Sequence, residues 1–382
     1  MNKIIVFFCI SIIFIGCKDN KYNLNQDITT YNVNIEERQK VSVFDLFSDI
    51  QVIPLETNKE SLIAWGLPQI YKDKIYILED RRNIILCFNT EGKWLFNINH
   101  TGRGAHEYQS LQSLSFDRKN DYLLLHEFFG PIHEYTLNRE FIHKYNCKDL
   151  PVTHYLEAIN KDTLMLFDMY NNPKIHFYSR RENKVIKSLY KENKLVNSSP
   201  LFYFYNGSLY FLSSCYGNTT YNLSDTKQEP AFQWDFGKYN YNVANIHIPN
   251  MTEKQWLGKV EIEWRQKNCP YVFAQEFENK QYVYLSLILN YTGNISQGIQ
   301  PQWVNIFYNK TTHKYHIFDD FKEKIDWGVI FEMDDDYVYC KTNNYTKNLI
   351  LQSHILSSEE QQKLLNMKDD DNYAIIRFKF KK

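Results

Sequence analysis

Glycine and proline are scarce in this sequence, and neither sign of charge dominates it. The chain of 382 residues has 13 glycines and 10 prolines, too few for a collagen-like or low-complexity disordered protein. Its 44 basic residues balance 45 acidic ones, whereas nucleic-acid-binding domains usually carry a basic excess. We therefore expect a folded protein without a nucleic-acid partner.

Signatures of common catalytic and metal sites are missing too. No H-E-x-x-H or G-x-S-x-G segment occurs, so neither a zinc-protease helix nor a nucleophile elbow is indicated. The seven cysteines contain no C-x-x-C pair, and five remain at wide spacings once Cys9 and Cys17 of the N-terminal segment are set aside. We expect these five to be small buried hydrophobes, with one disulfide pair left open as an alternative. The sequence thus predicts no metal and no cofactor. The five are Cys87, Cys147, Cys215, Cys269 and Cys340.

The N-terminus carries a targeting signal. The segment "MNKIIVFFCISIIFIGCKDN" has an apolar run over residues 4–15 that is short for a membrane span and typical of a signal-peptide core. Its end, Phe14 to Cys17, resembles a bacterial lipobox, which implies cleavage after residue 16 and a lipid on Cys17. The alternative is an ordinary secretory signal followed by an unrelated cysteine. We predict a signal peptide over 1–16, a polar lipidated tether over 17–44, and a folded domain over 45–382.

Aromatic residues are abundant and follow a repeat. They form 16% of the chain, which favours pleated, half-buried β-structure. Six segments share one pattern, a polar turn followed by a bulky strand, and most are preceded by one apolar stretch and followed by two. Four short strands per roughly 40–50 residues are typical of a β-propeller blade. An irregular β-sandwich or barrel is the alternative. The six segments are 73–80, 120–127, 161–168, 206–213, 280–287 and 335–342.

The two ends of the domain are expected to close the ring. The last strand, "YAIIRFKF" (373–380), fits the third strand of blade six, and "DIQVIPLE" (49–56) has no blade of its own. Pairing the two would complete blade six and cover an open sheet edge. Two short helical insertions are predicted, one within "MTEKQWLGKVEIEWRQKN" (251–268) and one over 357–367. The fold class is therefore all-β, a six-bladed propeller with four-stranded blades.

Three segments carry a resemblance to a known family. "IPLET" (53–57), "FNTEGKWLFNI" (88–98) and "GRGAHEY" (102–108) resemble six-bladed, NHL-like β-propeller lipoproteins of Bacteroidetes. The family's loop runs G-x-G-P-x-E-Y; Gly102, Gly104, Glu107 and Tyr108 match it, and Ala105 replaces the proline. The resemblance implies the fold and a place in the cell envelope, as an outer-membrane lipoprotein in the periplasm or at the surface. It implies no reaction.

The "GRGAHEY" loop allows three interpretations. A phosphate cradle would need more glycines and a following helix, and a strand follows here. A metal site would use His100, His106 and Glu107, but a single loop does not fix ligand geometry. We favour a link between two blades that opens near the central channel, where glycine permits positive φ and close backbone approach. Arg103, His106, Glu107 and Tyr108 are then either structural or ligand-facing.

Two main hypotheses of function follow. The first is a non-catalytic module, attached to the membrane by its lipid, that binds a glycan or protein ligand. The second is a propeller hydrolase or lyase whose active site lies at the mouth of the channel and draws residues from several blades. A purely structural scaffold is a third. The missing catalytic motifs favour the first.

Overall fold

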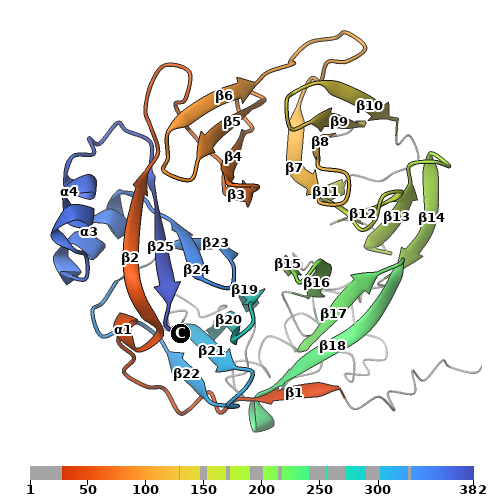
Figure 1. The fold of residues 1–382 in the computed structure, drawn as a ribbon. Helices are drawn as coiled ribbons and strands as arrows, with labels where there is room; N and C mark the ends of the chain where they lie inside the picture. The colour runs from red at the N-terminus through yellow and green to blue at the C-terminus, as the bar shows by residue number, and fades with distance from the viewer. Residues whose placement is uncertain are drawn as a thin grey trace, which may run out of the picture.

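The computed structural model is a ring of six β-sheets (Figure 1). It describes residues 28–128, 130–146, 153–168, 173–189, 201–213, 217–240, 255, 272–289, 302–325 and 328–382. Each sheet contains one propeller blade of four antiparallel strands, and five of the six blades use strands that are consecutive in the chain. The predicted fold class is confirmed.

The first three blades occupy the first half of the ring. Blade one has β3 (Pro68–Tyr71), β4 (Lys74–Glu79), β5 (Ile84–Asn89) and β6 (Trp94–Ile98). Blade two has β7 (Leu111–Asp117), β8 (Tyr122–Glu127), β9 (Ile132–Thr136) and β10 (Phe141–Tyr145). Blade three has β11 (Thr153–Ala158), β12 (Thr163–Asp168), β13 (Ile175–Ser179) and β14 (Lys184–Leu189).

The last three blades complete the ring. Blade four has β15 (Leu201–Tyr205), β16 (Ser208–Leu212), β17 (Thr219–Ser224) and β18 (Lys227–Asp235), followed by the short 3₁₀ helix η1 (Gly237–Tyr239). Blade five has β19 (Val272–Glu278), β20 (Tyr282–Leu289), β21 (Gln302–Asn309) and β22 (Tyr315–Phe318). Blade six has β23 (Val329–Met333), β24 (Tyr337–Lys341), β25 (Ala374–Phe380) and β2 (Phe47–Pro54).

The chain ends close blade six as predicted. Strand β2 pairs antiparallel with β25, with Val52 opposite Ile376 and Ile53 opposite Ile375. All four of these side chains are buried, because each strand alternates its apolar residues between the two neighbouring blades. The closing pair thus joins the N-terminal and C-terminal parts of the domain in one sheet.

The domain starts earlier than the predicted boundary at residue 45. Residues 29–46, which we call the strap, run along the outer edges of blades four to six. Strand β1 (Thr29–Asn32) adds in parallel to β18, Gln39 donates its backbone N–H to the carbonyl of Ile317 (2.7 Å), and α1 (Val43–Leu46) follows. Of the predicted tether, residues 17–27 lie outside the described residues. The segment "YNVNI" buries Tyr31, Val33 and Ile35 and exposes the asparagines between them, the pattern of a half-buried strand.

Two helices lie outside the ring beside blade six (Figure 1). The helix predicted over 357–367 is present as α4 (Ser358–Leu365), and its N-cap Ser357 accepts from the N–H of Glu360. The preceding helix α3 (Asn344–Ser353) was not predicted. Glu360 accepts a hydrogen bond from the N–H of Val52 (2.6 Å), which ties α4 to the outer strand β2. Apart from Gln255, the helix predicted within 251–268 lies outside the described residues. No helix among the described residues is long and apolar enough to cross a membrane.

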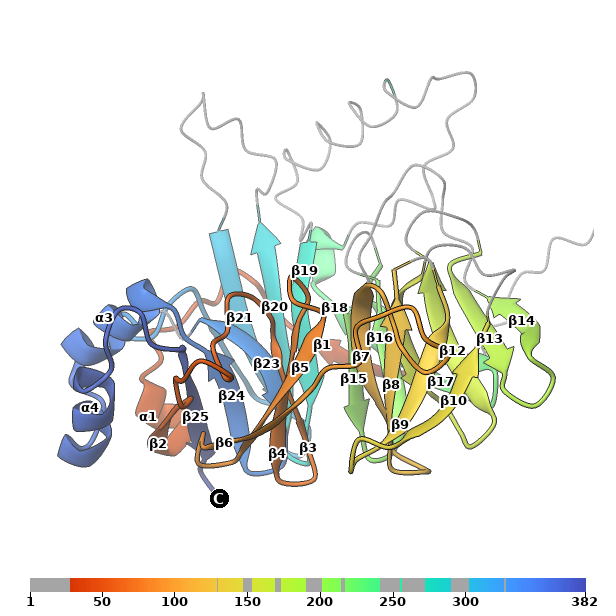
Figure 2. The same cartoon turned by 90° about the horizontal axis from the view of Figure 1, so that it is seen from above.

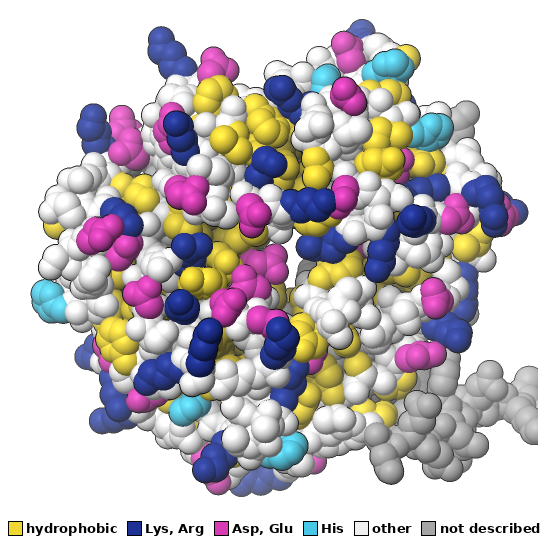
Figure 3. Space-filling model, viewed as in Figure 1, with side chains coloured by type: hydrophobic (Ala, Val, Ile, Leu, Met, Phe, Trp, Pro, Cys, Tyr) yellow, Lys and Arg dark blue, Asp and Glu magenta, His cyan; other side chains and the backbone are white. Residues whose placement is uncertain are grey.

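The propeller has two distinct faces (Figure 2). Antiparallel strands place the turns between first and second strands, such as 72–73 and 334–336, on one face, which we call the turn face. It is the lower face in Figure 2 and points toward the viewer in Figures 1 and 3. Connections between blades, such as 99–110, open on the opposite link face.

Candidate functional site

The "GRGAHEY" loop is a tight turn between β6 and β7. Gly102 donates its N–H to the carbonyl of Tyr108 (2.9 Å), and Tyr108 donates its N–H to the carbonyl of His100 (3.0 Å). Glu107 turns back into the loop, where its carboxylate accepts from the N–H of Gly104 (2.7 Å). A Cβ at Gly102 would lie 1.9 Å from that carboxylate, so a larger residue there would displace the Glu107 side chain from the loop. Neither glycine has positive φ, and that part of the expectation was wrong.

The loop lies over the outer part of blade two, not beside the channel as expected. His106 stacks on Phe141 of the outer strand β10 (4.2 Å between ring centroids), and its carbonyl accepts from the hydroxyl of Tyr135. Tyr108 is completely buried and its hydroxyl accepts from the N–H of His100 (3.2 Å). Glu107 and Tyr108 therefore hold the turn together. Arg103 and His106 are exposed, and a ligand-binding role for them remains a prediction.

Charged side chains converge instead on the central channel at the turn face (Figure 3). Glu157, near the end of β11, is buried and accepts hydrogen bonds from the hydroxyls of Ser115 (2.7 Å) and Tyr155 (3.0 Å). Burial raises the pKa of Glu157 to about 7 in spite of these donors. This carboxyl therefore titrates near neutral pH.

A second carboxyl comes from the opposite blade. Burial also raises the pKa of Glu332, on β23 of blade six, to about 7, with the negative charge of Glu157 adding to the rise and Arg118 opposing it. The guanidinium of Arg118 lies 5.3 Å from the ring centroid of Tyr71 and 4.8 Å from that of Phe204. Because these rings belong to the opposite blades one and four, Arg118 reaches across the channel at this face. Five blades thus bring a carboxylate, a cation or an aromatic ring to the mouth of the channel, a convergence that no local motif could reveal.

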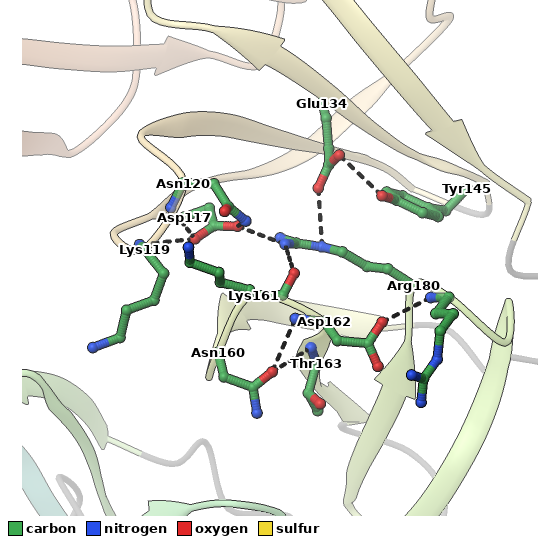
Figure 4. A network of polar contacts seen from close by, with 11 residues as sticks. Asp117, Lys119, Asn120, Glu134, Tyr145, Asn160, Lys161, Asp162, Thr163 and Arg180 are labelled. Atoms are coloured by element: carbon green, nitrogen blue, oxygen red, sulfur yellow. Dashed lines mark hydrogen bonds and ion pairs between the residues drawn. The ribbon is translucent and has the colours of Figure 1, made fainter.

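Other buried charges lie between blades and join them (Figure 4). Arg180, from the turn after β13, binds Asp117 of β7 through Nη1 (2.6 Å) and Glu134 of β9 through Nε (3.0 Å). Tyr145 donates to the other oxygen of Glu134 (3.0 Å). We call these four residues the Arg180 network; it links blades two and three. Among the described residues, no three His, Cys, Asp or Glu side chains gather in a way that could hold a metal ion.

A large groove opens between blades five and six. It has a volume of about 1380 Å³ and is bordered by the strap, by β21, by residues 319–325, by the start of β23 and by α3. Two of its aromatic side chains are strongly exposed, Trp303 (54%) and Tyr345 (66%). An exposed aromatic ring at a concave site offers a flat apolar surface to a ligand. We call this feature the blade five–six groove.

Polar groups in the groove are held in place by neighbours. Asn305 accepts from the hydroxyl of Tyr284 (2.8 Å) and donates to the carbonyl of Asp319 (3.1 Å). The Asp319 carboxylate binds Arg38 of the strap (3.2 Å). These contacts fix polar groups in the wall of the groove before any ligand arrives. The sequence offers Trp303 as one of seven tryptophans able to stack on sugar rings but does not single it out, because its exposure depends on how the two blades diverge.

The architecture defines a six-bladed β-propeller with a charged channel mouth and an open groove between two blades. The chain belongs to the family described as "Domain of unknown function (DUF4934)", whose model matches residues 27–379. No curated protein matches it. Its fold is similar to that of a protein from Bacteroides fragilis designated an exported protein (TM-score 0.70, 15% identity), with 93% of this chain and 100% of that chain covered. It is also similar to a DUF4221 family member from Bacteroides vulgatus (TM-score 0.52, 13% identity, 88% and 97% covered).

Proposed function

We propose that the protein is a non-catalytic binding module of the bacterial cell envelope and that it binds a glycan in the blade five–six groove. The observation that carries the proposal is the exposure of Trp303 and Tyr345 in a groove with fixed polar groups. Sugar rings present an apolar C–H face and a rim of hydroxyls. An exposed indole can stack on the apolar C–H face, and amides and carboxylates can form hydrogen bonds with the hydroxyls.

The cellular location that we propose for the protein follows from its N-terminal sequence. A lipid on Cys17 would attach the propeller to the outer membrane, on the periplasmic side or at the surface, where glycans are handled. The export designation of the B. fragilis protein of similar fold supports a place outside the cytoplasm. Acyl chains contribute about 0.8 kcal/mol per buried CH₂, so more than one chain anchors a protein durably.

The test is glycan binding by the purified protein and by one substitution, Trp303→Ala. We expect affinity for the bound glycan to fall about tenfold, which corresponds to ~1.4 kcal/mol of binding free energy. Trp65 supplies a matched control, since its exposure (61%) is similar to that of Trp303 (54%) and it lies outside the groove. Equal losses for Trp65→Ala and Trp303→Ala, or no binding across a panel of glycans, would refute the proposal.

One observation favours the enzyme hypothesis. Glu157 and Glu332 come from opposite blades toward the channel, and each has a pKa of about 7, suited to proton transfer at neutral pH. A hydrolase or lyase would use one as acid and the other as base. Release of reducing ends or unsaturated sugars from a glycan, abolished by Glu332→Gln and retained by Trp303→Ala, would establish this second function. Binding without turnover would leave the first.

A further inference from the structure

We propose that the blade five–six groove selects anionic glycans, those carrying uronate or sulfate groups; the inference rests on the proposed function and narrows its ligand class. The motive is the imbalance of charge in the groove. Four cationic side chains line it against two carboxylates among the described residues. These are Arg38, Lys40, Lys322 and Lys324 against Asp319 and Asp320.

Two of the cations are available for a ligand. Arg38 is paired with Asp319, and Lys322 lies 3.9 Å from Asp45. Lys40 and Lys324 are both exposed and, within the described part of the chain, neither forms an ion pair. An unpaired ammonium in the same groove as an exposed indole offers a binding point for a carboxylate or sulfate on a stacked sugar ring.

The two lysines belong to segments that are far apart in the sequence and fixed together in space. Lys40 lies on the strap and Lys324 on the turn after β22. Between these segments, Lys322 donates its N–H to the carbonyl of Val41 (2.8 Å). Glu323 accepts from the hydroxyl of Ser42 (2.6 Å) and from the N–H of Val43 (3.0 Å).

The strap therefore builds one wall of the groove. Because this wall is hydrogen-bonded along its length, the backbones that carry the two ammonium groups are positioned before a ligand binds. Such preorganisation lowers the entropic cost of association. It also gives the packing of the strap a role beyond covering the edges of three blades.

The test compares two ligands that differ only in charge. One is an oligogalacturonate, and the other is the same oligosaccharide after its carboxylates are reduced to alcohols. A κ-carrageenan oligosaccharide, which carries sulfate and no uronate, forms a third arm and separates sulfate from carboxylate recognition. We expect the anionic ligands to bind more tightly, with the preference shrinking as salt rises from 0.05 to 0.3 M, because the screening length falls to below about 10 Å.

Substitution of the two unpaired lysines tests whether they cause the preference for anionic ligands. Lys40→Gln/Lys324→Gln is expected to weaken anionic binding about three- to tenfold, the sum of two exposed ion pairs, and to leave the neutral ligand unchanged. Lys59→Gln/Lys187→Gln removes equal charge from exposed positions outside the groove and should change neither.

The possible failures are distinguishable. Equal binding of the charged and reduced oligosaccharides, both dependent on Trp303, would overturn the inference and leave the proposed function standing. Equal losses in the two double variants would also overturn it, because binding would then follow overall charge. Absence of Trp303-dependent binding in all three arms would remove the proposed function and the inference together.

Discussion

The space between blades two and three and the space between blades five and six are equivalent in the ring and opposite in content. Arg180 and two carboxylates bridge the first, where only a smaller hollow of about 380 Å³ remains and the Arg180 side chain is 7% exposed. The second holds a groove of about 1380 Å³ with two exposed aromatic rings. Because the blades of a propeller diverge outward, a wedge-shaped space lies between each neighbouring pair. Here buried charge pairs hold one wedge together, and another is left open to bind.

The comparison predicts that the Arg180 network matters most to stability. Arg180→Ala leaves Asp117 and Glu134 buried without their cation, and breaking a buried ion pair from one side costs about 3–5 kcal/mol. We expect the free energy of unfolding, measured by chemical denaturation, to fall by that amount. Arg181→Ala is the matched control, since its side chain is exposed and a surface change usually stays within about 0.5 kcal/mol. Equal effects would mean that the wedge is not sealed by charge.

The sequence predicts the strands of the blades better than it predicts the contacts in the wedges between them. The six aligned segments lie in the second strands of their blades, and the 49–56 segment closes blade six, because apolar alternation is a local signal. The strap shows the same apolar alternation in "YNVNI", but the asparagines in this stretch made it resemble a polar tether. Arg180 and Asp117 lie 63 residues apart, so no motif joins them. Their meeting follows only from the angle between blades.

A third wedge, between blades four and five, holds a buried carboxyl that should make the stability of the protein depend on pH. Glu276 is buried there and accepts from the indole of Trp234 (2.7 Å) and the hydroxyl of Thr220; burial raises its pKa to about 8. The folded state therefore binds a proton that the unfolded state releases near pH 4–5. Stability supplied by this proton is complete below that range and is lost as pH rises toward 8, at up to about 1.4 kcal/mol per pH unit.

The measurement is the unfolding free energy at pH 5, 7 and 9. We expect it to decrease with pH, and we expect Glu276→Gln to flatten the decrease because an amide oxygen still accepts from Trp234 and carries no charge. Glu157 and Glu332, with pKa values of about 7, each add a decrease that ends at a lower pH than that of Glu276 and that Glu276→Gln leaves in place. An unchanged profile in Glu276→Gln would show that this carboxyl is ionised in the fold.

Substitution in the blade five–six groove should have the smallest effect on the free energy of unfolding, in contrast to substitution in the Arg180 network. Trp303 is 54% exposed, so Trp303→Ala is expected to change the unfolding free energy by less than about 0.5 kcal/mol while it weakens glycan binding. A residue kept for packing would show the opposite pair of results. A loss of more than about 2 kcal/mol would place the indole in the range of core truncations and would make the groove a structural seam like the wedge between blades two and three. Denaturation and glycan binding measured on Trp303→Ala decide between a binding role and a packing role. Only a binding role lowers the affinity and leaves the free energy of unfolding nearly unchanged.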